Sequence, residues 1–174
     1  MFSRCIYYLC PDAYVSSIFE INLKALKAKG FKGIIIDLDN TLVKPRSQEV
    51  SEEVISWIKA MGELGYKRCL LSNSLPKRVQ AFSSKFGIPC ISRAAKPRKK
   101  VFLRALSELG TKSAETAVIG DQLFTDILGG KRSELFTILV SPLDKKELLT
   151  TALMRYPEKM ILNFLNRRGL LKPL

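Results

Sequence analysis

Residues 31–42 read FKGIIIDLDNTL, an apolar run that stops abruptly at two aspartates. The run from Phe31 to Ile36 is short and rich in β-branched residues, as in a buried strand of a parallel sheet. Asp37 and Asp39 follow it directly, and the carboxyl end of a parallel strand is where open α/β sheets bind their ligands. The stretch therefore predicts a strand that ends in a functional loop.

Strand-like and helix-like segments alternate on the carboxyl-terminal side of this stretch, which is the order of βαβ units. Periodicity predicts helices at residues 50–64, 79–86, 99–109 and 124–132, and strands at 69–71, 88–91, 116–119 and 135–140. Ser47 is expected to cap the first of these helices. The fold class is therefore α/β, a three-layer Rossmann-like fold with a five-stranded, mainly parallel sheet and helices on both faces.

The two ends of the chain are predicted to be helical. Residues 14–29 read as one or two helices, and residues 144–168 read as a pair interrupted at Pro157. Both ends are expected to pack on the flanks of the sheet. We expect one domain over residues 1–174, with a core at 31–140 and helical segments at 1–30 and 142–174.

Composition narrows the chemistry. The 174 residues include no histidine, which excludes Ser-His and Cys-His nucleophile activation and His-ligated metal sites. The four cysteines lack the paired short spacing of a zinc site or a disulfide framework. The formal charge of +13 favours polyanions such as RNA, anionic lipid surfaces or phosphorylated substrates. Catalysis is therefore expected to use carboxylates, lysines and hydroxyls.

The apolar runs are strand-sized, far below the roughly 20 residues of a membrane-spanning helix. Met1 to Cys10 lacks the apolar core of a signal peptide, because Cys5 and the pair at 11–12 interrupt it. We therefore expect a cytoplasmic protein that does not span a bilayer.

The two aspartates of the opening stretch admit two interpretations. Asp37 and Asp39 would repel each other if both were buried, and a hard divalent cation, magnesium most naturally, removes that conflict. The alternative is that Asp37 only ends a strand and that Asp39 and Asn40 form a turn. The stretch alone leaves both interpretations open.

Three further predicted strand ends carry polar side chains. Ser72 and Asn73 could bind phosphate oxygens, and Lys96, beside a proline, could neutralise a phosphoryl group. Asp121 could reach a metal held by the first strand, and Asp126 could orient Lys96 or a water molecule. Each group could instead be a helix cap or a solvated loop, but four such coincidences in this order are improbable.

Together these residues resemble the motifs of the haloacid dehalogenase (HAD) superfamily. The matching motifs are DxDxT at 37–41, Ser72, Lys96 and GDxxxxD at 120–126, and the resemblance covers about residues 31 to 140. More narrowly, the motifs are similar to those of the subfamily IIIA group called YqeG-type phosphatases. That group is similar to the fungal and plant phosphatidylglycerophosphate phosphatases.

The resemblance implies a magnesium-dependent phosphatase. Asp37 would attack phosphorus to form an aspartyl-phosphate, and Asp39 would protonate the leaving alkoxide and then activate water. Magnesium would be held by Asp37, Asp121 and the backbone carbonyl of Asp39. The phosphate would be bound by Ser72, Asn73 and Lys96, with Thr41 and Asp126 in support.

The gaps at residues 42–67 and 74–95 are too short for a cap domain, so the site is expected to stay open. Basic residues gather beside the third motif, at Arg93, Lys96, Arg98, Lys99 and Lys100. The resemblance, together with the open, basic site, implies that the substrate is a phosphate monoester on an anionic phospholipid, phosphatidylglycerophosphate, in phospholipid synthesis. The alternatives are a phosphatase of a soluble or nucleic-acid phosphate ester, and an RNA- or ribosome-associated binding protein with the same fold.

The tail at residues 152–174 mixes apolar and basic residues, as an interfacial amphipathic helix would. The preferred interpretation is that it packs on its own domain, and the alternative is peripheral contact with the inner membrane surface. Phe82, Phe86 and Phe102 fall on core faces, which disfavours stacking on RNA bases.

Overall fold

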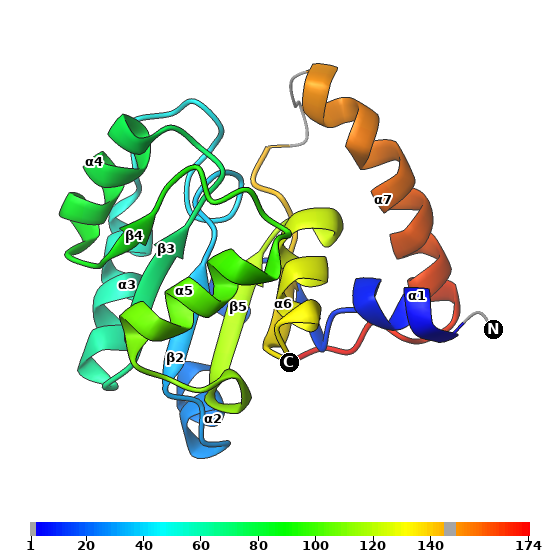
Figure 1. Ribbon diagram of the computed structural model, residues 1–174, viewed down its shortest axis with the longest axis horizontal. Helices are drawn as coiled ribbons and strands as arrows, with labels where there is room; N and C mark the ends of the chain where they lie inside the picture. Colours follow the sequence, from blue (N-terminus) through cyan, green and yellow to red (C-terminus); the bar gives the residue numbers. More distant parts are fainter. Residues whose placement is uncertain (1–2, 145–148) are drawn as a thin grey trace.

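A computed structural model of the chain describes residues 3–144 and 149–174 (Figure 1). The strands are β1 (Ala13–Val15), β2 (Gly33–Ile36), β3 (Lys67–Leu71), β4 (Cys90–Ile91), β5 (Thr116–Gly120) and β6 (Phe136–Val140). The helices are α1 (Ser3–Leu9), α2 (Leu23–Ala28), α3 (Glu52–Glu63), α4 (Pro76–Phe86), α5 (Lys99–Leu109), α6 (Leu128–Arg132) and α7 (Leu149–Arg167). Short helical turns lie at η1 (Ile18–Glu20), η2 (Ser113–Glu115) and η3 (Leu123–Ile127).

The strands form one six-stranded sheet in the order β1-β6-β5-β2-β3-β4, and every pair is parallel. The central strand β2 pairs with β3 on one side and β5 on the other. The connections diverge at this point, and a doubly wound sheet binds ligands at such a switch point. Loops that follow β2, β3 and β5 therefore meet at one edge of the sheet.

Helices cover both faces of the sheet, as predicted. Ile34 and Ile36 of β2 pack in the larger core with α3 and α4, whereas Ile35 packs in a second core with α5. In Figure 1, α5 and α6 lie in front of the sheet and α3 lies behind it. This alternation confirms the α/β three-layer fold, because successive side chains of a strand point to opposite faces.

Two predictions at the amino-terminal side were wrong in detail. The sheet has a sixth strand, β1, where residues 14–29 were expected to be helical; α2 occupies only part of that segment. A three-residue edge strand is too short to show an alternating pattern. The cap of α3 is Ser51, whose side chain accepts from the Val54 amide, and Ser47 lies in the preceding loop.

The carboxyl-terminal segment also differs from its prediction. Instead of two helices, α7 is one helix that contains Pro157. Its inner face packs on the domain, since Leu165 is fully buried and Glu158 accepts a hydrogen bond from the Phe124 amide at 3.1 Å. These contacts favour a continuous helix in spite of the proline. The part of the prediction at residues 145–148 lies outside the described residues.

No cap domain interrupts the described residues between the motifs. The chain between β2 and β3 holds only α3, and the chain between β3 and α5 holds α4 and β4. None of the described helices combines the length and apolarity required to cross a membrane. Cys10, Cys69 and Cys90 are free thiols, in agreement with the cysteine spacing.

Gly129 sets the distance between α5 and α6. A Cβ atom at this position would lie 2.1 Å from a ring carbon of Phe102, which is fully buried. Real atoms cannot approach so closely, so any side chain would push the two helices apart. The two helices cover the face of β5 that bears Val118.

We predict that Gly129→Ala lowers the free energy of unfolding by about 1–3 kcal/mol, the usual penalty of an overpacked core. Urea denaturation of the variant and of native protein measures the difference. Adding Phe102→Leu should give a less than additive loss, because the smaller side chain leaves room for the methyl group. A stability of Gly129→Ala equal to that of the native protein would contradict this account.

Candidate active site

The loop after β2 turns sharply and brings its polar side chains inward. The Asp37 amide still donates to the Ile119 carbonyl of β5 at 2.9 Å, so Asp37 is held in register with the sheet. Asn40 has a φ of 66°, a left-handed conformation that asparagine tolerates better than most residues. The Thr41 hydroxyl then lies 3.3 Å from Asp37 Oδ2 and 3.5 Å from Asp121 Oδ1.

Lys96 enters the site from a constrained loop after β4. Arg93 and Ala95 have φ values of 45° and 56°, conformations that cost about 1–3 kcal/mol for residues other than glycine. The Asn73 side-chain oxygen accepts from the Lys96 amide at 2.8 Å and fixes the loop to the end of β3. The buried ammonium group then reaches the carboxylates of other loops.

The Lys96 ammonium joins two carboxylates from different strands. Its Nζ lies 2.5 Å from Asp37 Oδ1 and 2.6 Å from Asp126 Oδ1. All three side chains are almost completely buried. Charge-assisted hydrogen bonds of this kind are the strong ones in proteins, and burial strengthens them further.

Asp126 reaches Lys96 because the chain passes close to itself at Gly120. A Cβ atom at Gly120 would lie 2.3 Å from Asp126 Cγ, so only glycine leaves space for the carboxylate. The turn η3 carries Asp126 back toward β5, where its Oδ2 accepts from the Gln122 amide at 3.2 Å. The glycine at the start of the GDxxxxD motif therefore has a steric role.

The acidic residues gather in one buried cluster. Carboxylate oxygens of Asp37, Asp121 and Asp126 all lie within 4.8 Å of one another. Burial raises the pKa of the Asp37 carboxyl to about 7, although the Lys96 ammonium opposes this shift. Burial also lowers the pKa of the Lys96 ammonium, but Asp126 and Asp37 outweigh that effect and the net pKa is raised. Without a bound cation, burial and the neighbouring Asp126 charge therefore disfavour the ionised form of Asp37.

This donor set fits a hard divalent cation. The cluster holds three buried carboxylates, of which Asp37 and Asp126 contact the Lys96 ammonium. Oxygen ligands are those that magnesium and calcium prefer. A cation would favour the ionised form of Asp37, which burial otherwise disfavours. The cluster contains two predicted metal ligands, Asp37 and Asp121, together with Asp126, which was predicted only in a supporting role.

The predicted residues Asp39, Ser72 and Asn73 lie at the same edge in different surroundings. The Asp39 side chain is partly exposed and binds Ser74 and Arg78 instead of the buried carboxylates. Ser72 is buried, and its hydroxyl accepts from the Ser74 amide at 3.1 Å. The predicted phosphate contacts of Ser72 and Asn73 stay predictions.

Arg78 is the site residue that the sequence did not indicate. It lies in the first turn of α4 and reaches Asp39 across 39 positions of the chain. Nothing in the local sequence distinguishes it from the neighbouring Lys77. The contact of Ser74 with Asp39 is likewise not indicated by the local sequence.

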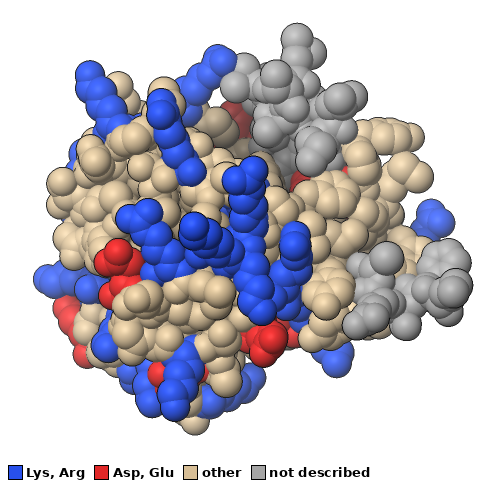
Figure 2. Space-filling model, in the orientation of Figure 1, with Lys and Arg blue, Asp and Glu red and all other residues tan. Residues whose placement is uncertain are grey.

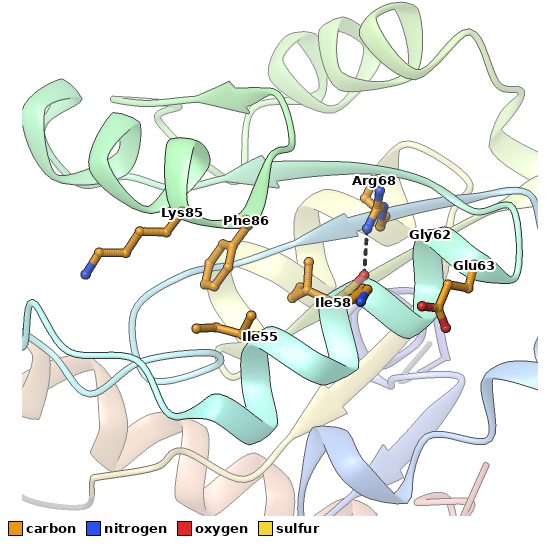
Figure 3. A pocket seen from close by; sticks show the side chains of 8 residues that line it. Ile55, Ile58, Gly62, Glu63, Arg68, Lys85 and Phe86 are labelled. Carbon is orange, nitrogen blue, oxygen red and sulfur yellow. Dashed lines mark hydrogen bonds between the residues drawn. The ribbon is translucent and has the colours of Figure 1, made fainter.

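One surface hollow lies next to the loop after β2, and another lies away from the site. The first, of about 440 Å³, borders the loop after β2 at Thr41, Leu42 and Val43, and Phe19 and Leu143 add apolar surface to it. The other, of about 510 Å³, lies between α3 and α4 (Figure 3). In it, Arg68 donates to the Ile58 carbonyl at 2.6 Å. The second hollow is lined by none of the predicted site residues.

The fold and the four loops define a hydrolase of the HAD type, and the comparisons with known proteins agree. Residues 46–134 match the family of haloacid dehalogenase-like hydrolases. The chain is also 42% identical over 162 residues to the probable phosphatase YqeG of Bacillus subtilis, with 93% of this chain and 94% of that protein covered. The chain therefore belongs to the haloacid dehalogenase-like hydrolases, and the prediction of an enzyme of the HAD phosphatase type is confirmed.

More distant relatives include phosphatidylglycerophosphate phosphatase 1 of Arabidopsis thaliana, 28% identical over 149 residues. The match spans 80% of this chain but only 43% of the plant protein, and 53% of a similar protein of Chlamydomonas reinhardtii. Among solved structures, NagD of E. coli K-12 superposes with a TM-score of 0.55 at 15% identity, over 66% of this chain and 90% of that one. That similarity shows the fold alone.

We predict that Lys96→Ala lowers the free energy of unfolding by about 3–5 kcal/mol, because it leaves Asp37 and Asp126 buried without their cation. Urea denaturation at neutral pH, with and without Mg²⁺, measures the loss. Adding Asp126→Asn should recover part of it, since one of the two carboxylates then loses its charge. A Lys96→Ala variant as stable as the native protein would show that the contacts of Lys96 with Asp37 and Asp126 do not stabilise the fold.

Proposed function

We propose that the chain is a magnesium-dependent phosphomonoester hydrolase that works through an aspartyl-phosphate on Asp37. The observation that carries the proposal is the buried cluster of Asp37, Asp121 and Asp126, in which Asp37 and Asp126 contact the Lys96 ammonium. Such a cluster supplies a nucleophile and a field of positive charge once a divalent cation is bound. The similarity of the chain to a probable phosphatase, over nearly its whole length, supports the same reaction.

The proposed reaction has two displacements at phosphorus. In the first, an Asp37 oxygen bonds to phosphorus, the bond to the leaving oxygen breaks, and Asp39 gives that oxygen a proton. In the second, water attacks phosphorus, Asp39 accepts its proton, and the bond to Asp37 breaks to release phosphate. Phosphoryl transfer depends mainly on positioning and on cations around three charged oxygens.

The residues of this chain would divide the work. Lys96 orients Asp37 and offers positive charge to the phosphoryl oxygens, and Ser72 and nearby amides would bind those oxygens. Magnesium held by Asp37, Asp121 and the Asp39 carbonyl would neutralise charge on the phosphoryl group. Asp126 would keep Lys96 in place, and Thr41 would brace Asp37.

We further propose phosphatidylglycerophosphate as the substrate, in phosphatidylglycerol synthesis. Plant and algal relatives bear the name of that activity. The site lacks a cap among the described residues, so a substrate whose bulk stays outside can reach it. The hollow beside Thr41 presents apolar side chains next to the catalytic loop, where the glycerol and acyl parts of a lipid would lie.

The distribution of charge supports contact with an anionic membrane. Figure 2 shows Lys and Arg side chains gathered over the face that α5 covers. The exposed basic residues beside the Lys96 loop are Arg93, Arg98, Lys99, Lys100 and Arg104. Phe102 of α5 and Phe82 and Phe86 of α4 are buried and offer no stacking surface to RNA. A lipid surface therefore suits this face better than single-stranded RNA.

The outer face of α7 carries exposed apolar side chains. Tyr156, Met160 and Phe164 recur every four residues and are 71%, 60% and 36% exposed. Exposed Lys159 and Arg167 lie on the same helix, a combination typical of interfacial helices. The inner face of α7 packs on the domain, so the helix can contact the domain and a membrane surface at the same time without moving.

We predict that the native chain releases phosphate from phosphatidylglycerophosphate in mixed micelles, and that Asp37→Asn lowers the rate by about 10³-fold or more. A metal chelator should abolish the native rate, and added Mg²⁺ should restore it. Phosphate release from soluble esters and from a 5′-phosphorylated oligonucleotide is measured in parallel. Equal rates for native protein and Asp37→Asn would exclude the mechanism, and turnover of soluble esters alone would exclude the lipid.

We predict binding to vesicles of phosphatidylglycerol and phosphatidylcholine, but not to vesicles of phosphatidylcholine alone. Each basic residue near an anionic surface contributes about 1 kcal/mol, so Lys99→Glu/Lys100→Glu should weaken sedimentation with vesicles by about ten-fold or more. Lys24→Glu/Lys29→Glu is the matched control, because it changes the charge equally at α2 and its C-cap, at the opposite end of the sheet. Equal weakening in both variants would show that only net charge matters.

A further inference from the structure

The Asp39 carboxylate is held by a clamp of donors from the loop after β3 and from α4. Arg78 donates to Asp39 Oδ1 from Nε at 2.9 Å and from Nη2 at 2.7 Å. The Ser74 hydroxyl donates to Asp39 Oδ2 at 2.6 Å. Both oxygens are therefore engaged, and the side chain has a defined orientation in spite of its partial exposure.

The same guanidinium group also holds the chain that follows the catalytic loop. Arg78 Nη1 donates to the Ser47 carbonyl, and Nη2 lies 3.3 Å from the Lys44 carbonyl. The ring of Phe82, one turn further along α4, lies 5.2 Å below the guanidinium. One side chain thus connects α4, the Asp39 carboxylate and residues 44–47.

Only arginine can make this set of contacts. A guanidinium group is planar and presents donors in fixed directions, whereas a lysine ammonium is a point charge on a flexible stem. The arrangement uses all three nitrogens of Arg78. A lysine at this position could replace the charge but not the orientation of the carboxylate.

We infer that Arg78 is a positioning residue that aims Asp39 at the leaving oxygen and at the attacking water. This inference rests on the proposed function. In the proposed reaction Asp39 gives a proton to the leaving oxygen and takes one from the attacking water, both of them next to the phosphorus that bonds to Asp37. Asp39 sits on a short loop that would otherwise leave its side chain free to rotate. A displacement of about 1 Å costs about 10²-fold in such a reaction.

The experiment compares Arg78→Ala and Arg78→Lys with Lys77→Ala, which removes the same charge from the same helix turn without touching Asp39. Hydrolysis of glycerol 3-phosphate and of p-nitrophenyl phosphate is measured with Mg²⁺. The alkyl leaving group needs a proton from Asp39, whereas the nitrophenolate needs it much less. Arg78→Ala should lower kcat about 10²-fold on the alkyl ester and much less on the aryl ester, with KM nearly unchanged.

Arg78→Lys should behave like Arg78→Ala, and Lys77→Ala like native protein. In an Asp39→Asn background, Arg78→Ala should cause no further loss, because Arg78 acts through Asp39. A rise in KM with unchanged kcat would overturn the inference and make Arg78 a substrate-binding group. Additive losses in the double variant, or equal losses on both esters, would also overturn it.

Hydrogen exchange of residues 42–50 provides a readout that does not depend on turnover. Arg78→Ala should exchange faster there than Lys77→Ala, because residues 44–47 lose two of their contacts. If the native chain hydrolyses no phosphate ester, the proposed function fails and the catalytic part of the inference falls with it. If the native chain is active and both variants match it, only the inference about Arg78 fails. Thermal unfolding of each variant separates misfolding from loss of positioning.

Discussion

The Lys96 ammonium between Asp37 and Asp126 is the interaction on which the rest of the site depends. Burying two carboxylates so close together is unfavourable unless a cation lies between them, and the loop of Lys96 adopts strained conformations to deliver it. Gly120 leaves the space that Asp126 needs, and Asn73 holds the loop in place. Three segments remote in sequence are therefore tied together by one charge.

The parallel sheet makes this arrangement available. Because β3 and β5 flank β2 in the same direction, all three strands deliver their following loops to one edge. The apolar side chains of β2 fill the cores on both faces, and the aspartates begin where those cores end. The same edge carries exposed cations and borders a partly apolar hollow, which is why we favour a lipid phosphate over a small enclosed metabolite.

Much of the fold followed from local patterns. The helix over 99–109 has the bounds that its periodicity indicated, and the strands at the centre of the sheet were predicted within two residues. The cap of α3 was placed four residues too early, and the larger errors fell toward the ends of the chain. The edge strand β1 forms only because β6 offers it a partner, and α7 continues through Pro157 because its inner face packs on the domain. Neither effect is encoded within a window of neighbouring residues.

The class of fold and the chemical character of the site could be read from the amino-acid sequence. Apolar strands followed by Asp37, Ser72, Lys96 and Asp121 carry that information locally, through residue type and order along the chain. Which of these groups touch depends on how the loops meet in the folded protein. Lys96 pairs with Asp37 and Asp126, whereas Asp39 turns to Ser74 and Arg78, because loops from separate strands converge in three dimensions and one arginine on α4 happens to reach across them. Such partners are set by packing, and a residue's own neighbours in the chain do not reveal them.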